Sequence, residues 1–150
     1  MAAYQTIVVG TDGSDSSFRA VDRAALIAAD TGATLVIVSA YHPARAEDLA
    51  RVQDQLGQDV AYQVVGSTPA EEAVRTASER ARAAGATKVD TVVVDGEPVP
   101  TLARVVAERA ADLLVVGNRG LNTLAGRILG SVPSEAARKS RVDVLIVHTT

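Results

Sequence analysis

Short runs of apolar residues recur along the chain, separated by longer polar or amphipathic stretches. They are rich in leucine and β-branched residues and do not alternate with polar residues, as is typical of strands buried on both faces of a sheet. A buried helix segment can show the same pattern, so the stretches between the runs must decide. The runs that we interpret as strands are Ile7–Val9, Leu35–Val38, Val92–Val94, Leu113–Val116 and Val144–Val147.

Three of the intervening stretches carry apolar residues at every third or fourth position, which marks one face of a helix. The periodic positions span Phe18–Ala28, Ala70–Ala84 and, less regularly, Leu102–Ala110. Gly32 and Gly85 follow the first two stretches, where a left-handed residue often ends a helix. Strands that alternate with helices predict an α/β fold, with a parallel sheet and helices on both of its faces.

Residues 41–66 do not follow this alternation. They contain a charged helical candidate at Arg45–Leu56 and a candidate short strand at Tyr62–Val65. Two interpretations stay open for this segment: a solvated insertion over the second crossover, or a lid or partner surface.

Length and composition narrow the class of protein. With 150 residues, the chain is expected to form a single domain over residues 1–150. It contains no cysteine, which excludes disulfides, thiolate metal sites and cysteine nucleophiles. An aromatic content of 3% and a net charge of −3 both disfavour nucleic acid as a partner. The sequence shows no signal peptide and no run of ~20 apolar residues, so we expect a cytoplasmic protein that does not insert into a membrane.

Two predicted strands end in the same pattern, V-V-G-x-x-G. It occurs at Val8–Gly13 and again at Val115–Gly120. In an open parallel sheet, ligands bind beyond the carboxyl ends of the strands, where the winding direction reverses. If these two strands are neighbours, the two loops form opposite sides of one crevice, and their glycines let a ligand approach the backbone. The alternative is that each glycine only makes a tight turn.

A longer motif follows the second of these loops. Gly117 and Gly120 are followed, after nine residues, by Gly130 and Ser131. Val132 and Pro133 then open a helical stretch that runs to about residue 140. Free backbone N–H groups at Gly130 and Ser131, on the N-terminus of this helix, predict an anion site that would bind phosphate. Ser131 as a plain helix cap is the competing interpretation.

Charged residues near this motif could assist it. Arg119 or Arg127 would supply the counter-charge for a phosphate, although Arg127 could equally be a solvated surface residue. Glu135 falls near the expected helix start, where the helix dipole favours an acidic side chain.

The first loop adds candidates for the rest of a nucleotide. Gly10 and Thr11 enter the loop, and Asp12 could accept hydrogen bonds from a ribose hydroxyl, hold a metal through water, or cap the next helix. Because residues 14–16 already offer several caps, we favour ligand contact for Asp12. Ala40, beyond the second strand, opens onto the same edge and could face an adenine.

These residues resemble the universal stress protein family. The likeness rests on Gly117-x2-Gly120-x9-Gly130-Ser131 and on Val9-Gly10-Thr11-Asp12-Gly13-Ser14, and it extends from Ile7 to Val147. It implies a single doubly wound five-stranded parallel sheet of order 3-2-1-4-5 that binds ATP, AMP or cyclic AMP, with Mg added to ATP. Asp12 would then contact the ribose and Ala40 would line the base pocket. The phosphate would be held by Gly117, Asn118, Arg119, Gly120, Gly130, Ser131 and Val132. Many members have a small hydroxyl residue where this chain has Asn118, so the number of phosphates stays open.

The chain carries no recognisable catalytic machinery. Neither lysine, Lys88 or Lys139, lies in a G-x4-G-K-[S/T] loop, and His42 and His148 do not form a metal-ligand pair. We therefore predict a nucleotide-binding regulatory protein of the stress response, with no catalytic or metal-ligating residues and at most slow ATP hydrolysis. Two alternatives stay open: an adenylating enzyme of a related fold, because Asp12–Ser17 is loosely similar to its S-G-G-x-D-S loop, and a dimeric stress protein without nucleotide.

The last strand bears on assembly. Val144–Val147 is apolar and contains neither lysine nor proline. If it lies at a sheet edge, that edge is therefore not protected against pairing with another strand. Pairing with a second copy across a two-fold axis would satisfy its backbone groups. The resemblance implies the same, so we predict a homodimer.

Overall fold

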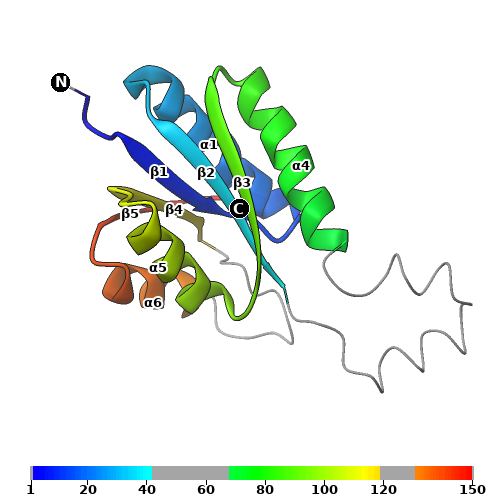
Figure 1. The fold of residues 1–150 in the computed structure, drawn as a ribbon, viewed down its shortest axis with the longest axis vertical. Coiled ribbons are helices and arrows are strands. Elements are labelled where there is room, and N and C mark those ends of the chain that lie inside the picture. The colour runs from blue at the N-terminus through cyan, green and yellow to red at the C-terminus, as the bar shows by residue number, and fades with distance from the viewer. Residues whose placement is uncertain (1, 42–67, 119–130, 150) are drawn as a thin grey trace, which may run out of the picture.

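A computed structural model of the chain describes residues 2–41, 68–118 and 131–149. It contains a five-stranded, all-parallel sheet in the order β3-β2-β1-β4-β5 (Figure 1), which confirms the predicted fold class. The strands are β1 (Thr6–Gly10), β2 (Thr34–Tyr41), β3 (Lys88–Asp95), β4 (Leu113–Gly117) and β5 (Asp143–Val147). The helix expected at Arg45–Leu56 and the strand expected at Tyr62–Val65 lie outside the described residues.

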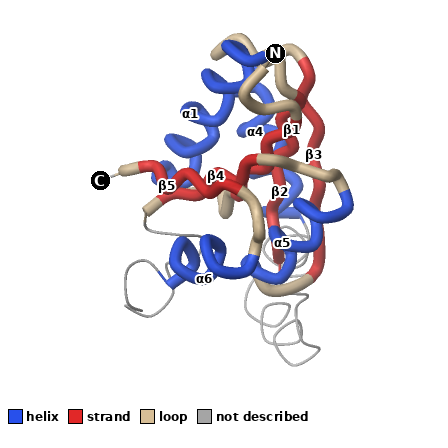
Figure 2. The backbone as a smooth tube through the Cα atoms, turned by 90° about the vertical axis from the view of Figure 1, so that its left-hand side faces the viewer, coloured by secondary structure: helices blue, strands red, loops and turns tan. Residues whose placement is uncertain are grey.

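Helices cover both faces of the sheet. They are α1 (Asp15–Thr31), α4 (Thr68–Ala83), α5 (Pro98–Glu108) and α6 (Ser131–Lys139). Figure 2 shows α1 and α4 on one side of the strands and α5 and α6 on the other. Helix α1 ends as its sequence predicted, because Gly32 adopts φ 72° and its N–H donates to the carbonyl of Ala28.

Alternate residues of each central strand enter different cores. Ile7 and Val9 of β1 pack with α1 and α4, whereas Val8 packs with α5 and α6. Successive side chains of a strand point to opposite faces, so a strand covered on both sides needs an unbroken apolar run. This explains why the central strands read as continuous valine, leucine and isoleucine.

The edge strands depart from that expectation. We expected all five apolar runs to be buried on both faces, but Val92–Val94 of β3 are only half-buried and Ile146 of β5 is exposed. The expectation was wrong for these two strands because each has a neighbour on one side only and lies at the margin of the helical layers. Along β3, Asp90 accepts a hydrogen bond from Arg109, which follows α5, and this contact lowers the pKa of the Asp90 carboxyl.

Among residues 2–41, 68–118 and 131–149, no helix has both the length and the apolar content needed to cross a membrane.

Candidate functional site

The two strands that carry the V-V-G-x-x-G pattern are neighbours in the sheet. Pairing between β1 and β4 ends at Val9 and Val115. On their other sides the same strands pair further, to Gly10 with β2 and to Gly117 with β5. The two loops therefore leave the sheet side by side, at the point where the chain winds away in opposite directions. This is the switch point at which open α/β sheets bind ligands.

The first loop is held in place largely by Thr11. Its side chain is 1% exposed, and its hydroxyl lies 2.7 Å from the Ser17 hydroxyl and accepts from the Gly13 N–H at 3.1 Å. Its own N–H donates to the carbonyl of Val38 at 2.9 Å. We predicted a ligand contact here, and the structure shows that the side chain and amide of Thr11 fix the shape of the loop.

Asp12 is exposed at the turn that leads into α1. Its Oδ1 accepts from the Ser14 N–H at 2.9 Å, and Ser14 caps the helix by accepting from the Ser17 N–H at 3.2 Å. The cap thus falls to one of the residues expected to provide it, and Asp12 stabilises the turn before it. Gly13 adopts φ +85°, and a Cβ there would lie 3.3 Å from that of Ala73. The turn therefore requires glycine at position 13.

A shallow hollow of about 320 Å³ lies between this turn and α4. It is lined by Asp12, Gly13, Phe18, Pro69, Glu72, Ala73 and Thr76. Asp12 therefore borders the space over α4, two residues beyond the end of β1.

Ala40 lies near the carboxyl end of β2, opposite Val94 of β3, and is half-buried. Gly10 is level with Val38 in the neighbouring strand, so Ala40 lies two residues beyond it along the same edge. Gly117 ends β4 further along that edge. The structure thus brings Gly10, Ala40 and Gly117 to the carboxyl edge of the sheet, as the sequence predicted.

The second loop begins with Asn118, whose polar groups contact the last residue of β5 and a residue just beyond it. Its N–H donates to the carbonyl of Val147 at 2.8 Å. Its side-chain Oδ1 accepts from the N–H of Thr149 at 2.9 Å and from the Thr149 hydroxyl at 2.7 Å. A Cβ at Gly117 would lie 3.4 Å from the methyl group of Thr149. Sequence reasoning did not identify Thr149, because no motif marks it.

The remaining phosphate candidates are only partly described. Arg119, Gly120, Arg127 and Gly130 lie outside the described residues. Helix α6 begins at Ser131, with Val132 and Pro133 in its first turn, as predicted. Glu135 falls beyond the first turn, which contains no acidic residue. The expected interaction of Glu135 with the positive end of the helix was therefore wrong, because that effect falls off within one turn.

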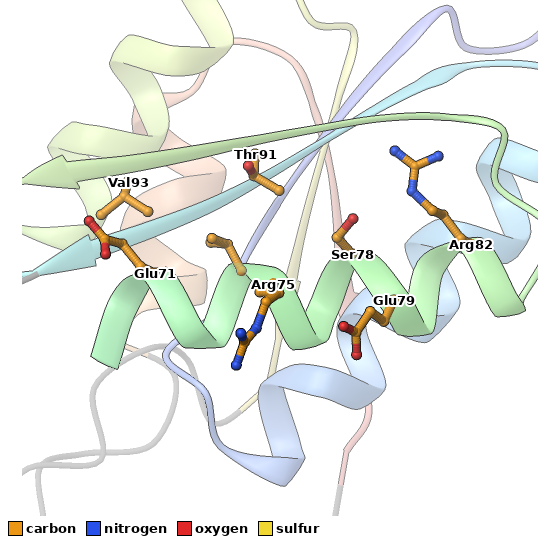
Figure 3. Close-up of a pocket in the computed structure, with 8 residues that line it drawn as sticks. Glu71, Arg75, Ser78, Glu79, Arg82, Thr91 and Val93 are labelled. Atoms are coloured by element: carbon orange, nitrogen blue, oxygen red, sulfur yellow. The ribbon is translucent and has the colours of Figure 1, made fainter. Parts of the chain in front are cut away.

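A second hollow, of about 430 Å³, lies between α4 and the edge strand β3. In Figure 3, Glu71, Ser78 and Arg82 of α4 extend toward β3, whereas Arg75 and Glu79 point away from it. Acidic and basic residues alternate along this helix at a spacing that favours pairing within the helix. This groove is separate from the carboxyl edge of the sheet, and no sequence motif points to it. Within the described parts of the chain, no group of three or more His, Asp or Glu side chains is placed to hold a metal.

Comparisons with known proteins agree with this architecture. The sequence model of the universal stress protein family matches residues 3–148. The universal stress protein Rv1636 of Mycobacterium tuberculosis is 56% identical over 150 residues, covering 100% of both chains. A crystal structure of a universal stress protein in complex with cAMP is 50% identical, with a TM-score of 0.75 and 100% of both chains covered. UspA from Lactobacillus plantarum shares the fold at 22% identity, with a TM-score of 0.76 over 98% of this chain and 99% of that one. The chain therefore belongs to the universal stress protein family, in the branch marked by the G-x2-G-x9-G-[S/T] spacing.

Proposed function

We propose that this protein binds an adenine nucleotide in the crevice between the ends of β1 and β4 and acts as a regulatory protein of the stress response. The observation that carries this proposal is the end of β1–β4 pairing at Val9 and Val115, from which two glycine-bearing loops leave side by side. A relative that is 50% identical over its full length has been solved with cAMP bound, which supports the same class of ligand for this chain.

The proposed contacts divide the nucleotide among three elements. Asp12 would accept from the ribose hydroxyls, and Ala40 would line the base pocket beyond β2. Backbone N–H groups after Gly117 and at the start of α6 would bind the phosphate, because a helix N-terminus combines free donors with a favourable dipole. The residues proposed for the phosphate are Gly117, Asn118, Arg119, Gly120, Gly130, Ser131, Val132 and Pro133.

These residues favour binding of the nucleotide without its chemical turnover. Phosphoryl transfer needs a metal-held phosphate and a group that activates the attacking water or acceptor. In the described part of the crevice, Asp12 is the one acidic side chain from a candidate loop, and its Oδ1 already accepts from the backbone of Ser14. We therefore assign this chain a sensing role rather than a catalytic one.

Calorimetric titration of the purified protein with cAMP, AMP and ATP tests the proposal. We expect micromolar binding of at least one of the three, and mass spectrometry of co-purified nucleotide would identify which one the cell supplies. The absence of binding to all three would contradict the proposal. ATP turnover with release of pyrophosphate would instead support an adenylating enzyme.

We also infer that the protein is a homodimer that pairs through β5. This strand lies at the sheet edge and carries neither lysine nor proline. Its residue Ile146 is 45% exposed. An apolar, unguarded edge exposes backbone donors and acceptors that a second copy can satisfy across a two-fold axis.

Replacing Ile146 with lysine is expected to convert the dimer to a monomer, because a charged side chain on an edge strand opposes strand pairing. Light scattering measures the outcome at a protein concentration on the order of tens of micromolar, where a dimer with a micromolar Kd is mostly associated. Leu26→Lys, at a position on α1 that is 50% exposed, is the matched control and should leave the dimer intact. A monomeric wild-type protein, or a dimer that Ile146→Lys does not affect, would count against this interface.

A further inference from the structure

Thr149 connects the two sides of the proposed nucleotide crevice. It lies two residues beyond β5 and is 3% exposed. Its N–H and its hydroxyl both donate to Asn118 Oδ1, at 2.9 Å and 2.7 Å. The Ser16 hydroxyl lies 2.6 Å from the Thr149 hydroxyl, and the Arg19 guanidinium donates to the Thr149 carbonyl.

These partners come from the elements that border the crevice. Asn118 is the first residue after β4 and directly precedes residues 119–130 of the phosphate motif. Ser16 and Arg19 lie in the first turns of α1, the helix that follows the Asp12 loop. A hydroxyl has a single proton, so if the Thr149 hydroxyl donates to Asn118, the Ser16 hydroxyl donates to Thr149. The resulting chain of hydrogen bonds runs from α1 through Thr149 to the end of β4.

Other contacts fix the backbone of Gly117 and Asn118 at the end of β4. The Asn118 N–H donates to Val147 at 2.8 Å, and the Thr149 methyl group lies against Gly117, where even a Cβ would approach it to 3.4 Å. The amide side chain of Asn118 is long enough to carry an acceptor to Thr149.

We propose that Thr149 is a positioning residue for nucleotide binding, which fixes Gly117 and Asn118 at the end of β4, where the proposed phosphate contacts begin. The role rests on the proposed function, because it concerns the same crevice. Binding is weaker when the groups that contact a ligand must be ordered as it arrives. The hydrogen bonds from Thr149 hold Asn118, a proposed phosphate contact, before binding and so remove part of this cost at that residue.

Thr149→Val removes the hydroxyl and keeps the shape of the side chain. We expect it to weaken binding of cAMP, or of whichever of AMP and ATP the wild-type protein binds, by roughly fivefold to tenfold. Thr149→Ser restores the hydroxyl and should bind within about twofold of wild type. The side-chain amide signals of Asn118 in a ¹⁵N spectrum should shift in Thr149→Val without nucleotide and return toward their wild-type positions in Thr149→Ser.

The matched control is Thr31→Val. The Thr31 hydroxyl donates to the carbonyl of Ile27 at 2.8 Å, at the far end of α1 from the crevice. This variant also loses a threonine hydrogen bond, so its Tm should fall as in Thr149→Val, while its nucleotide affinity stays unchanged. If Thr149→Val does not fold, Ser16→Ala removes one partner of the same hydroxyl and should weaken binding roughly twofold to fivefold.

Two results would separate the failure of this role from that of the proposed function. Wild-type binding together with an unchanged Kd in Thr149→Val, or Asn118 signals that do not move, overturns the role of Thr149 alone. If the wild-type protein binds none of the three nucleotides, the proposed function fails and the role of Thr149 fails with it.

Discussion

Replacing Leu35 with alanine is expected to lower the free energy of unfolding by about 3 kcal/mol, a typical cost for truncating a buried leucine. Leu35 is fully buried in β2, where it packs in the core beneath α1 and α4. The strand has neighbours on both sides, β1 and β3, so the sheet cannot readily collapse around the lost side chain. Denaturant unfolding followed by circular dichroism measures the difference.

Leu26→Ala is the matched control, because the same chemical change occurs on the outer surface of α1. Leu26 is 50% exposed, so its truncation should change the free energy of unfolding by no more than about 0.5 kcal/mol. A similar cost at both positions would show that Leu35 does not pack in the core beneath α1 and α4.

Replacing Gly120 with valine is expected to weaken nucleotide binding by about a hundredfold or more. The reason lies in the motif, since Gly120 itself is outside the described residues. A β-branched side chain would hold an anion away from the backbone N–H groups that are proposed to bind it. Each hydrogen bond to a charged group contributes about 1.5–3 kcal/mol, so two lost contacts suffice for this effect. Calorimetric titration with cAMP, AMP and ATP gives the change in Kd.

Lys88→Ala controls for general effects of substitution on this titration. Lys88 is exposed at the start of β3, at the opposite end of the strands from the crevice, and its removal should leave Kd unchanged. Equal loss of binding in both variants, or full binding in Gly120→Val, would count against a phosphate site built from backbone donors.

Local apolar runs predicted the short strands better than the long ones. For β4 and β5 the run falls one residue short of the observed strand, and for β1 it falls two residues short, because the strand ends carry threonine, glycine or aspartate instead of large apolar side chains. For β2, the run Leu35–Val38 covers half of Thr34–Tyr41. For β3, the run Val92–Val94 predicts less than half of Lys88–Asp95. The first half of β3 contains the exposed residues Lys88, Asp90 and Thr91, so it lacks the apolar character by which a buried strand is recognised.

The candidate site was predictable only in part, for a related reason. Gly10, Ala40 and Gly117 were placed at one edge because parallel strands align their carboxyl ends. The contact of Thr11 with the ligand stays a prediction, whereas the bonds of its hydroxyl with Ser17 and Gly13 became visible only in the structure. Thr149 was missed because its partner Asn118 is 31 positions away, and the two meet only once β4 and β5 are neighbours.

The amino-acid pattern was sufficient to predict the α/β class, the positions of the helices in the described regions and the edge of the sheet from which the glycine loops start. Each of these follows from local patterns, which record whether a side chain is buried and where the chain must turn. The folded arrangement was needed to show where β1 and β4 stop pairing and that Thr149 donates to Asn118 at that edge. Those features depend on which distant segments become neighbours, and a hydrogen bond between them leaves no periodic trace in either segment.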